Sequence, residues 1–238
     1  VDGRDNVRIK FKKNSDENKS QINKCTMMYA YGYAGNNNRA FLTGNEDYPN
    51  IVSFSYIDDI TYMPVENVIK AGLETIPITG MVRLNDGKLA VLKDVSDTDS
   101  TIFYIGYATF NGNEAFPIEG TSKGEGNISQ HAHDMLINEP LILTNNGIFA
   151  LNTATLTDER YVYHRSYYID GKLKKENNLK DAIGICNDGK YYLAINNHVY
   201  VADSRFKSNS NNSKYSNYQY EWYYWINLPV RIWFVWNN

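Results

Sequence analysis

A hairpin pattern recurs through this chain about every 50 residues, and that repeat limits the possible folds more than any other feature. Four short apolar runs align with one another, and each is followed by a second strand-like run. The aligned runs begin at Arg39, Lys88, Pro140 and Lys190. A repeat of this length with about four strands per unit is typical of β-propeller blades. The repeat therefore predicts an all-β, β-propeller-like domain.

Turn residues separate the strand-like runs. Asn-Gly or Asp-Gly pairs occur within residues 85–87, 145–147 and 187–189. Such residues tolerate the positive φ angles that tight hairpins require. We place four four-stranded blades at roughly 25–72, 77–120, 132–166 and 182–226, within a single domain covering 1–238.

Two further strands are expected outside these blades. Residues 7–12 resemble the outer strand of a preceding blade, and residues 230–236 resemble the inner strand of a following one. The chain is thus either a small propeller closed in an unusual way or a slice of a larger one. The apolar run at 232–236 has no turn after it, which favours the slice. An open apolar strand invites pairing with another chain, so we expect self-association.

Three segments interrupt the strand pattern. Residues 170–182 carry Leu173, Leu179 and Ala182 among charged residues and predict one short helix between blades. Residues 207–216 are rich in Ser and Asn, which predicts an exposed hairpin loop. Residues 12–24 are similarly polar. The stretch 120–126 is rich in glycine, and we interpret it as a linker between blades, because a phosphate-binding loop requires a helix after it.

Composition lowers the expectation of several partner classes. The net charge is −3, from 24 basic and 27 acidic residues, so no positive field attracts nucleic acid or anionic lipid. No apolar run approaches the ~18 residues of a membrane span. Cys25 and Cys186 lie far apart, and we interpret them as two unpaired thiols. We expect neither nucleic acid nor membrane as a partner.

No pattern of catalytic residues stands out. The G-x-S-x-G turn of many hydrolases is missing. His131 and His133 are two residues apart, so a strand would direct both to one face, and Glu125 or Asp134 could join them around a metal. Zinc sites usually need three or four ligands, and no third histidine is near. We expect two solvated or hydrogen-bonded loop histidines and no metal.

Acidic clusters give a second set of candidates. Asp94, Asp97 and Asp99 could bind Ca²⁺, but they lack the spacing of an EF-hand loop, so we expect a solvated hairpin tip. A carboxylate pair for glycoside hydrolysis depends on three-dimensional separation and stays open. The sialidase-type Asp box is missing. We expect no catalytic residue, metal or cofactor, and the sequence assigns no binding residue.

Aromatic residues are unusually frequent, with 20 Tyr in the chain. They concentrate between Tyr215 and Trp236. Within this segment Tyr218, Tyr220, Trp222 and Tyr224 alternate with Tyr223 and Trp225, so both faces of a strand there would be aromatic. One face would pack in the blade core, and the other could contact sugar or protein.

Several segments resemble uncharacterised structural proteins encoded in tail-gene regions of phages and prophages of Gram-positive bacteria. They include FLTGNEDYPN at 41–50, TYMP at 61–64, EPLILTNNGIFAL at 139–151, HVYVADS at 198–204 and YEWYYW at 220–225, with shorter matches at 159–160 and 165–166. The resemblance covers roughly 39–229. It consists of blade hairpins and carries no catalytic residues. It implies a virion location, assembly in the bacterial cytoplasm and other phage structural subunits as partners.

Together these features predict a non-enzymatic phage tail or baseplate protein that acts as an assembly scaffold, with a homo-oligomer as one option. The first alternative is a carbohydrate-binding module that attaches to cell-surface glycan of the host wall. The second is a glycan hydrolase or lyase on a propeller scaffold.

Overall fold

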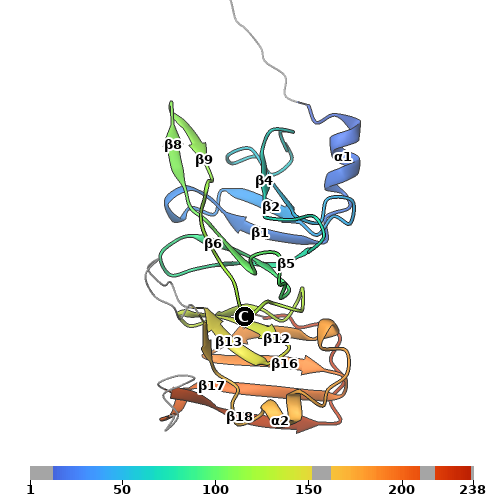
Figure 1. The fold of residues 1–238 in the computed structure, drawn as a ribbon, viewed down its shortest axis with the longest axis vertical. Helices are drawn as coiled ribbons and strands as arrows, with labels where there is room; N and C mark the ends of the chain where they lie inside the picture. Colours follow the sequence, from blue (N-terminus) through green and yellow to red (C-terminus); the bar gives the residue numbers. More distant parts are fainter. Residues whose placement is uncertain (1–12, 152–161, 210–217, 237–238) are drawn as a thin grey trace, which may run out of the picture.

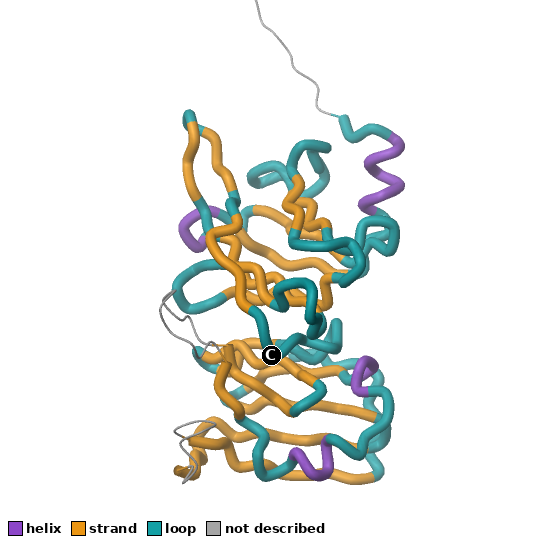
Figure 2. Tube along the Cα trace, in the orientation of Figure 1, coloured by secondary structure: helices purple, strands orange, loops and turns teal. Residues whose placement is uncertain are grey.

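The computed structural model describes residues 13–151, 162–209 and 218–236, and strands dominate it (Figures 1 and 2). Four sheets have four antiparallel strands each, and every sheet is a meander. Sheet 1 contains β1 (Met27–Tyr31), β2 (Arg39–Thr43), β3 (Ile51–Phe54) and β4 (Val68–Lys70). Sheet 2 contains β5 (Ile78–Arg83), β6 (Leu89–Lys93), β7 (Ile102–Ile105) and β10 (Ile118–Ser122).

The second half of the chain repeats this arrangement. Sheet 3 contains β11 (Asp134–Leu136), β12 (Glu139–Thr144), β13 (Gly147–Leu151) and β14 (Val162–His164). Sheet 4 contains β15 (Ile183–Asn187), β16 (Lys190–Ile195), β17 (His198–Asn209) and β18 (Tyr218–Ile226). The predicted all-β class with four-stranded units is thus confirmed. Among the described residues no sheet closes on itself, so the structure does not confirm a propeller ring.

Consecutive sheets pack face to face, and β6 shows how the sequence produces this. Leu89 and Val91 face sheet 1, whereas Ala90 and Leu92 face sheet 3. Because side chains alternate along a strand, a strand between two sheets must be apolar on both faces. All five residues of β6 are buried. Burial of each large aliphatic side chain contributes about 1.5–3 kcal/mol, so these interfaces hold the stack together.

The sheets approach one another most closely at their first strands. The backbone of β5 lies near both β1 and β11, and β11 lies near β15. A parallel bridge joins His131 to Ile183 at the same place. The pairs of fourth strands show no such approach of backbones within the described residues. The first strand of each sheet is therefore the strand that lies nearest the neighbouring sheets.

Gly80 lies on β5, the first strand of sheet 2, and the ring of His133 packs against it. A Cβ placed at Gly80 would lie 2.5 Å from Cε1 of His133. We expect Gly80→Ala to lower the free energy of unfolding by about 1–3 kcal/mol, because the ring must shift. Gly171→Ala is the control, since a Cβ there meets nothing within 4 Å. Thermal unfolding of both variants tests this; equal melting temperatures would show that the contact is unimportant.

Some sequence predictions were wrong. Residues 230–236 form no strand, because the described chain offers them no strand partner. The polar stretch 12–24 contains a helix, α1 (Asp16–Ile22). The single helix expected at 170–182 is instead α2 (Asp170–Leu173) and a separate 3₁₀ turn at Leu179–Asp181, because Asn178 between them has a left-handed backbone with φ of 60°.

Two strands between β7 and β10 form a separate two-stranded sheet that the repeat did not predict. β8 (Ala108–Phe110) and β9 (Asn113–Ala115) form a projecting hairpin (Figure 1). The linker expected at 120–126 begins inside β10, and the loop expected at 207–216 begins inside β17. The predicted strand at 7–12 lies outside the described residues. No described helix is long and apolar enough to span a membrane.

Candidate interaction surface

The outer face of sheet 4 carries aromatic side chains that the core does not use. On β18, Tyr220, Trp222 and Tyr224 pack toward sheet 3. Tyr223 and Trp225 point the opposite way and remain 46% and 44% exposed. The predicted two-faced aromatic strand is therefore confirmed. A contact role for the outer face remains a prediction.

The segment that follows β18 crosses this outer face. Asn227 adopts a positive φ of 57°, and the Leu228 amide donates to the Asn197 carbonyl at 3.0 Å. Val230 and Trp233 then pack against buried residues of sheet 4, namely Ala194, Val199 and Val201. The Trp233 indole Nε1 donates to the Ile183 carbonyl at 3.4 Å. The segment therefore runs back from β18, the last strand of sheet 4, toward β15, its first strand.

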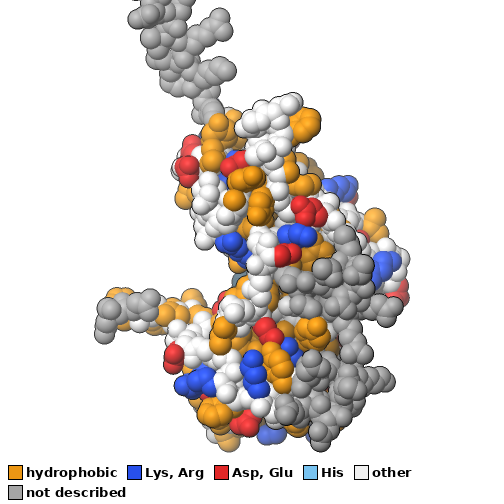
Figure 3. Space-filling view, turned by 90° about the vertical axis from the view of Figure 1, so that its left-hand side faces the viewer, with side chains coloured by type: hydrophobic (Ala, Val, Ile, Leu, Met, Phe, Trp, Pro, Cys, Tyr) orange, Lys and Arg blue, Asp and Glu red, His pale blue; other side chains and the backbone are white. Residues whose placement is uncertain are grey.

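Beyond this anchor the chain exposes large apolar side chains. Ile232, Phe234 and Trp236 are 75%, 76% and 79% exposed. Figure 3 shows hydrophobic side chains on an arm that projects from the body. We call residues 230–236 the arm, and the arm together with Tyr223, Trp225, Ile226 and Leu228 the end face. Large contiguous apolar surfaces of this kind mark interaction sites in soluble proteins.

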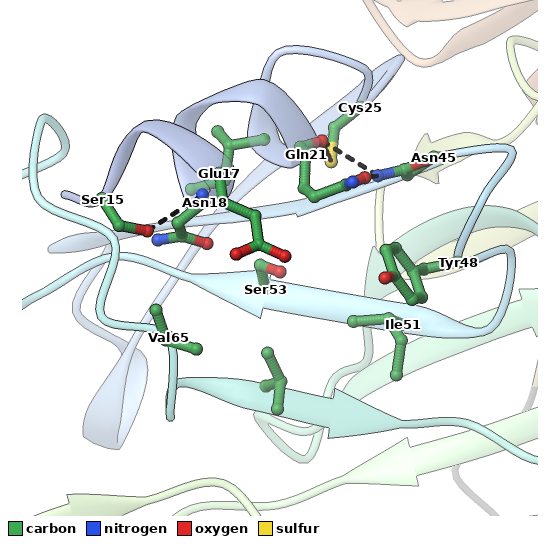
Figure 4. A pocket seen from close by; sticks show the side chains of 12 residues that line it. Ser15, Glu17, Asn18, Gln21, Cys25, Asn45, Tyr48, Ile51, Ser53 and Val65 are labelled. Atoms are coloured by element: carbon green, nitrogen blue, oxygen red, sulfur yellow. Dashed lines mark hydrogen bonds between the residues drawn. The ribbon is translucent and has the colours of Figure 1, made fainter.

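A groove lies at the other end of the stack, between α1 and the outer face of sheet 1 (Figure 4). The Ser15 hydroxyl caps α1 by accepting from the Asn18 amide at 3.1 Å. The Asn18 side chain donates to the Met63 carbonyl at 2.6 Å, which fixes the helix over the sheet. α1 itself buries no residue. A cavity of about 370 Å³ therefore remains beneath it.

The groove has aliphatic side chains on its floor, whereas the wall that α1 supplies is mostly polar and includes the acidic Glu17. Ile22, Ile51, Val65 and Val68 contribute the aliphatic lining. The Glu17 carboxylate points into the groove toward Ser53 (Figure 4). The volume of the groove lies in the range that proteins use to hold small ligands or side chains.

The acidic run 94–99 is only in part the solvated tip that was predicted: Asp97 is exposed, but Asp99 is not. Asp99 is buried, and its Oδ2 lies 2.6 Å from Nζ of Lys93, which is fully buried. Burial raises the pKa of Asp99, but hydrogen bonds from Lys93 and from the Leu73 and Ser100 amides outweigh it and hold the pKa below its usual value. Because Lys93 occupies this carboxylate, Asp99 is poorly suited to bind Ca²⁺.

A second charged cluster joins sheets 3 and 4. The Arg165 guanidinium donates to both oxygens of Glu139, at 2.8 and 2.9 Å. The Tyr220 hydroxyl donates to Oε2 at 2.7 Å, and the Tyr218 hydroxyl donates to Oε1. Burial raises the pKa of Glu139, but these donors outweigh it and lower the pKa. The cluster is a structural clamp, which the sequence repeat did not predict.

The two candidate histidines do not converge on a metal site. His131 is exposed, whereas His133 packs against Gly80, and burial lowers the pKa of His133. Glu125 accepts from Asn146 at 2.9 Å, and Asp134 accepts from the Cys186 amide at 2.6 Å. Over the described ranges, no group of three or more His, Cys, Asp or Glu side chains is placed to hold a metal.

One trio has the residue types of a hydrolytic triad but the wrong geometry. Asp170 Oδ2 and Ser166 Oγ both meet the same ring nitrogen of His164, Nε2, at 2.9 and 3.3 Å. In a triad the acid and the nucleophile contact different ring nitrogens. The buried Ser166 hydroxyl also accepts from the Ile148 amide at 2.7 Å and donates to Asp170. These contacts connect the 164–170 loop to β13.

Two carboxylates line one cleft beneath the β8–β9 hairpin. The cleft has a volume of about 630 Å³, and Glu66 and Glu114 both line it, with Tyr56 and Tyr62 nearby. The Arg39 guanidinium donates to Oε2 of Glu114 at 2.7 and 3.0 Å. Because Arg39 holds Glu114 Oε2 in an ion pair, this oxygen is poorly placed to donate a proton to a glycosidic bond.

Both cysteines are free thiols and partly buried. Burial raises the pKa of each, so neither is a reactive thiolate.

No model of a known protein family matches this chain, and no curated protein matches it either.

Proposed function

We propose that this protein is a non-enzymatic structural component of a phage tail or baseplate and that its end face docks a neighbouring subunit. The observation that carries this proposal is the end face itself, with Phe234 and Ile232 exposed on a projecting arm. A rigid stack of sheets supplies a scaffold without a cofactor, and its ends and loops are the natural contact surfaces. The resemblance to tail-region proteins supports the phage setting.

The arm provides the test. In particles produced by a bacterium carrying the phage genes, we expect Phe234→Asp to reduce incorporation of the protein strongly, because an exposed aromatic residue that would anchor the contact becomes a charge. Phe110→Asp is the matched control, since Phe110 is 72% exposed at the tip of the β8–β9 hairpin. Electron microscopy and immunoblots of purified particles give the readout. Equal incorporation of the two variants would count against the end face.

A carbohydrate-binding module is the second candidate. Two observations favour it: the exposed Tyr223 and Trp225 rings on one strand, and the cleft with Tyr56 and Tyr62. Aromatic faces with polar edges suit sugar rings. A glycan array with the wild-type protein and Trp225→Ala separates this candidate from the first, because only a lectin would lose signal. A glycan hydrolase or lyase would instead use Glu66 and Glu114, and Glu66→Gln would abolish its glycan turnover.

A further inference from the structure

The first and last sheets of the stack differ in shape. The arm projects from sheet 4, the last sheet, near the middle of the long axis of the molecule (Figure 3), and a groove opens between α1 and sheet 1, the first sheet. α1 and the C-terminal end lie in different parts of the molecule (Figure 1), so the arm is not placed to fill the groove of its own chain. The last sheet therefore carries a projection, and the first sheet carries a recess.

The chemistry of the arm matches that of the groove. The arm presents Ile232 and Phe234, and Arg231 precedes them and is exposed. The groove offers an aliphatic floor that includes Ile51 and Val68, with the Glu17 carboxylate at its side. An apolar projection with a positive charge thus corresponds to a recess with an aliphatic floor and a negative charge.

We propose that the arm of one copy of this chain inserts into the groove beneath α1 of a second copy. This inference rests on the proposed function, because it names the partner of the end face. In the complex Phe234 packs between α1 and β3–β4, and Arg231 pairs with Glu17. The cavity of about 370 Å³ accommodates an aromatic side chain with its neighbours.

The contact is heterologous, since two different surfaces of the chain meet. Each copy in a pair retains one unused arm or groove, so the same contact repeats into a ring or a filament. Such growth is the behaviour that a scaffold in an elongated particle requires.

Sedimentation velocity with three variants tests the proposal. Phe234→Asp removes the arm contact, and Val68→Arg places a positive charge in the groove at a residue that is 48% exposed. Phe110→Asp is again the control. We expect the wild type and the control to associate as concentration rises. We expect each of the first two variants to associate at least about 30-fold more weakly, the effect of losing an aromatic hot spot.

Mixing the two defective variants gives the sharpest readout. The Val68→Arg chain has an intact arm, and the Phe234→Asp chain has an intact groove. We therefore expect an equimolar mixture to form a one-to-one dimer that grows no further. A mixture that stays monomeric would overturn the proposal, as would a wild type that never associates or a Val68→Arg chain that associates like the wild type.

These outcomes are separable from the fate of the proposed function. If Phe234→Asp prevents incorporation into particles while the mixture stays monomeric, the end face docks another protein and only the groove assignment fails. If Phe234→Asp enters particles normally, the proposed function of the end face fails, whatever the chain does alone in solution.

Discussion

Replacing Lys93 by methionine is expected to lower the free energy of unfolding by about 3–5 kcal/mol, the usual effect of removing one partner from a buried ion pair. Lys93 is fully buried, and its ammonium donates to Asp99 and to the carbonyls of Ala71 and Leu73. Methionine fills a similar volume, so the loss reports the unpaired Asp99 charge. Urea unfolding followed by tryptophan fluorescence measures it.

A double variant separates charge from packing. Lys93→Met with Asp99→Leu removes both charges, and we expect it to recover more than half of the lost stability, because two apolar groups often replace a buried pair at little cost. A loss below about 1 kcal/mol for Lys93→Met would show that water reaches this site.

Glu139→Gln is expected to have the second largest effect, about 2–3 kcal/mol at neutral pH, because it weakens charge-assisted bonds to Arg165, Tyr218 and Tyr220. The Glu139 carboxylate is only partly exposed, so solvent screens these bonds weakly. The variant tests whether the clamp joins sheets 3 and 4.

The pH dependence of this effect has a definite sign. The folded-state pKa of Glu139 lies below its ordinary value, so its contribution is fully present above the unfolded pKa of about 4.3. The contribution is lost as pH falls through the lower, folded-state pKa. The difference between wild type and Glu139→Gln should therefore shrink below about pH 4. A difference that stays constant down to pH 3 would contradict the assignment.

The repeat allowed the strands to be predicted well, because the residues that produce each strand lie within it and in the turns beside it. β16 and β2 begin and end at the predicted residues, since apolar side chains alternate there between glycine and asparagine turns. α1 was missed because it buries no residue and therefore shows no apolar periodicity. The sequence signal for it was Ser15 followed by Asp16 and Glu17, a capping pattern.

The candidate site was predictable only in part. The alternation along β18 indicated an outward aromatic face, and Tyr223 and Trp225 lie there. The same apolar pattern at 230–236 predicted a strand, but a strand needs a neighbour, and the described chain provides none. The burial of Asp99 beside Lys93 depends on how residues 71–73 cross sheet 2, which sequence spacing does not encode.

Antibody labelling of phage particles from a bacterium that encodes this chain, viewed by electron microscopy, tests the proposed structural role most directly. Label concentrated at the tail or its tip is the result we predict. Particles that stay unlabelled while the protein is found elsewhere in the culture would contradict a role in the virion.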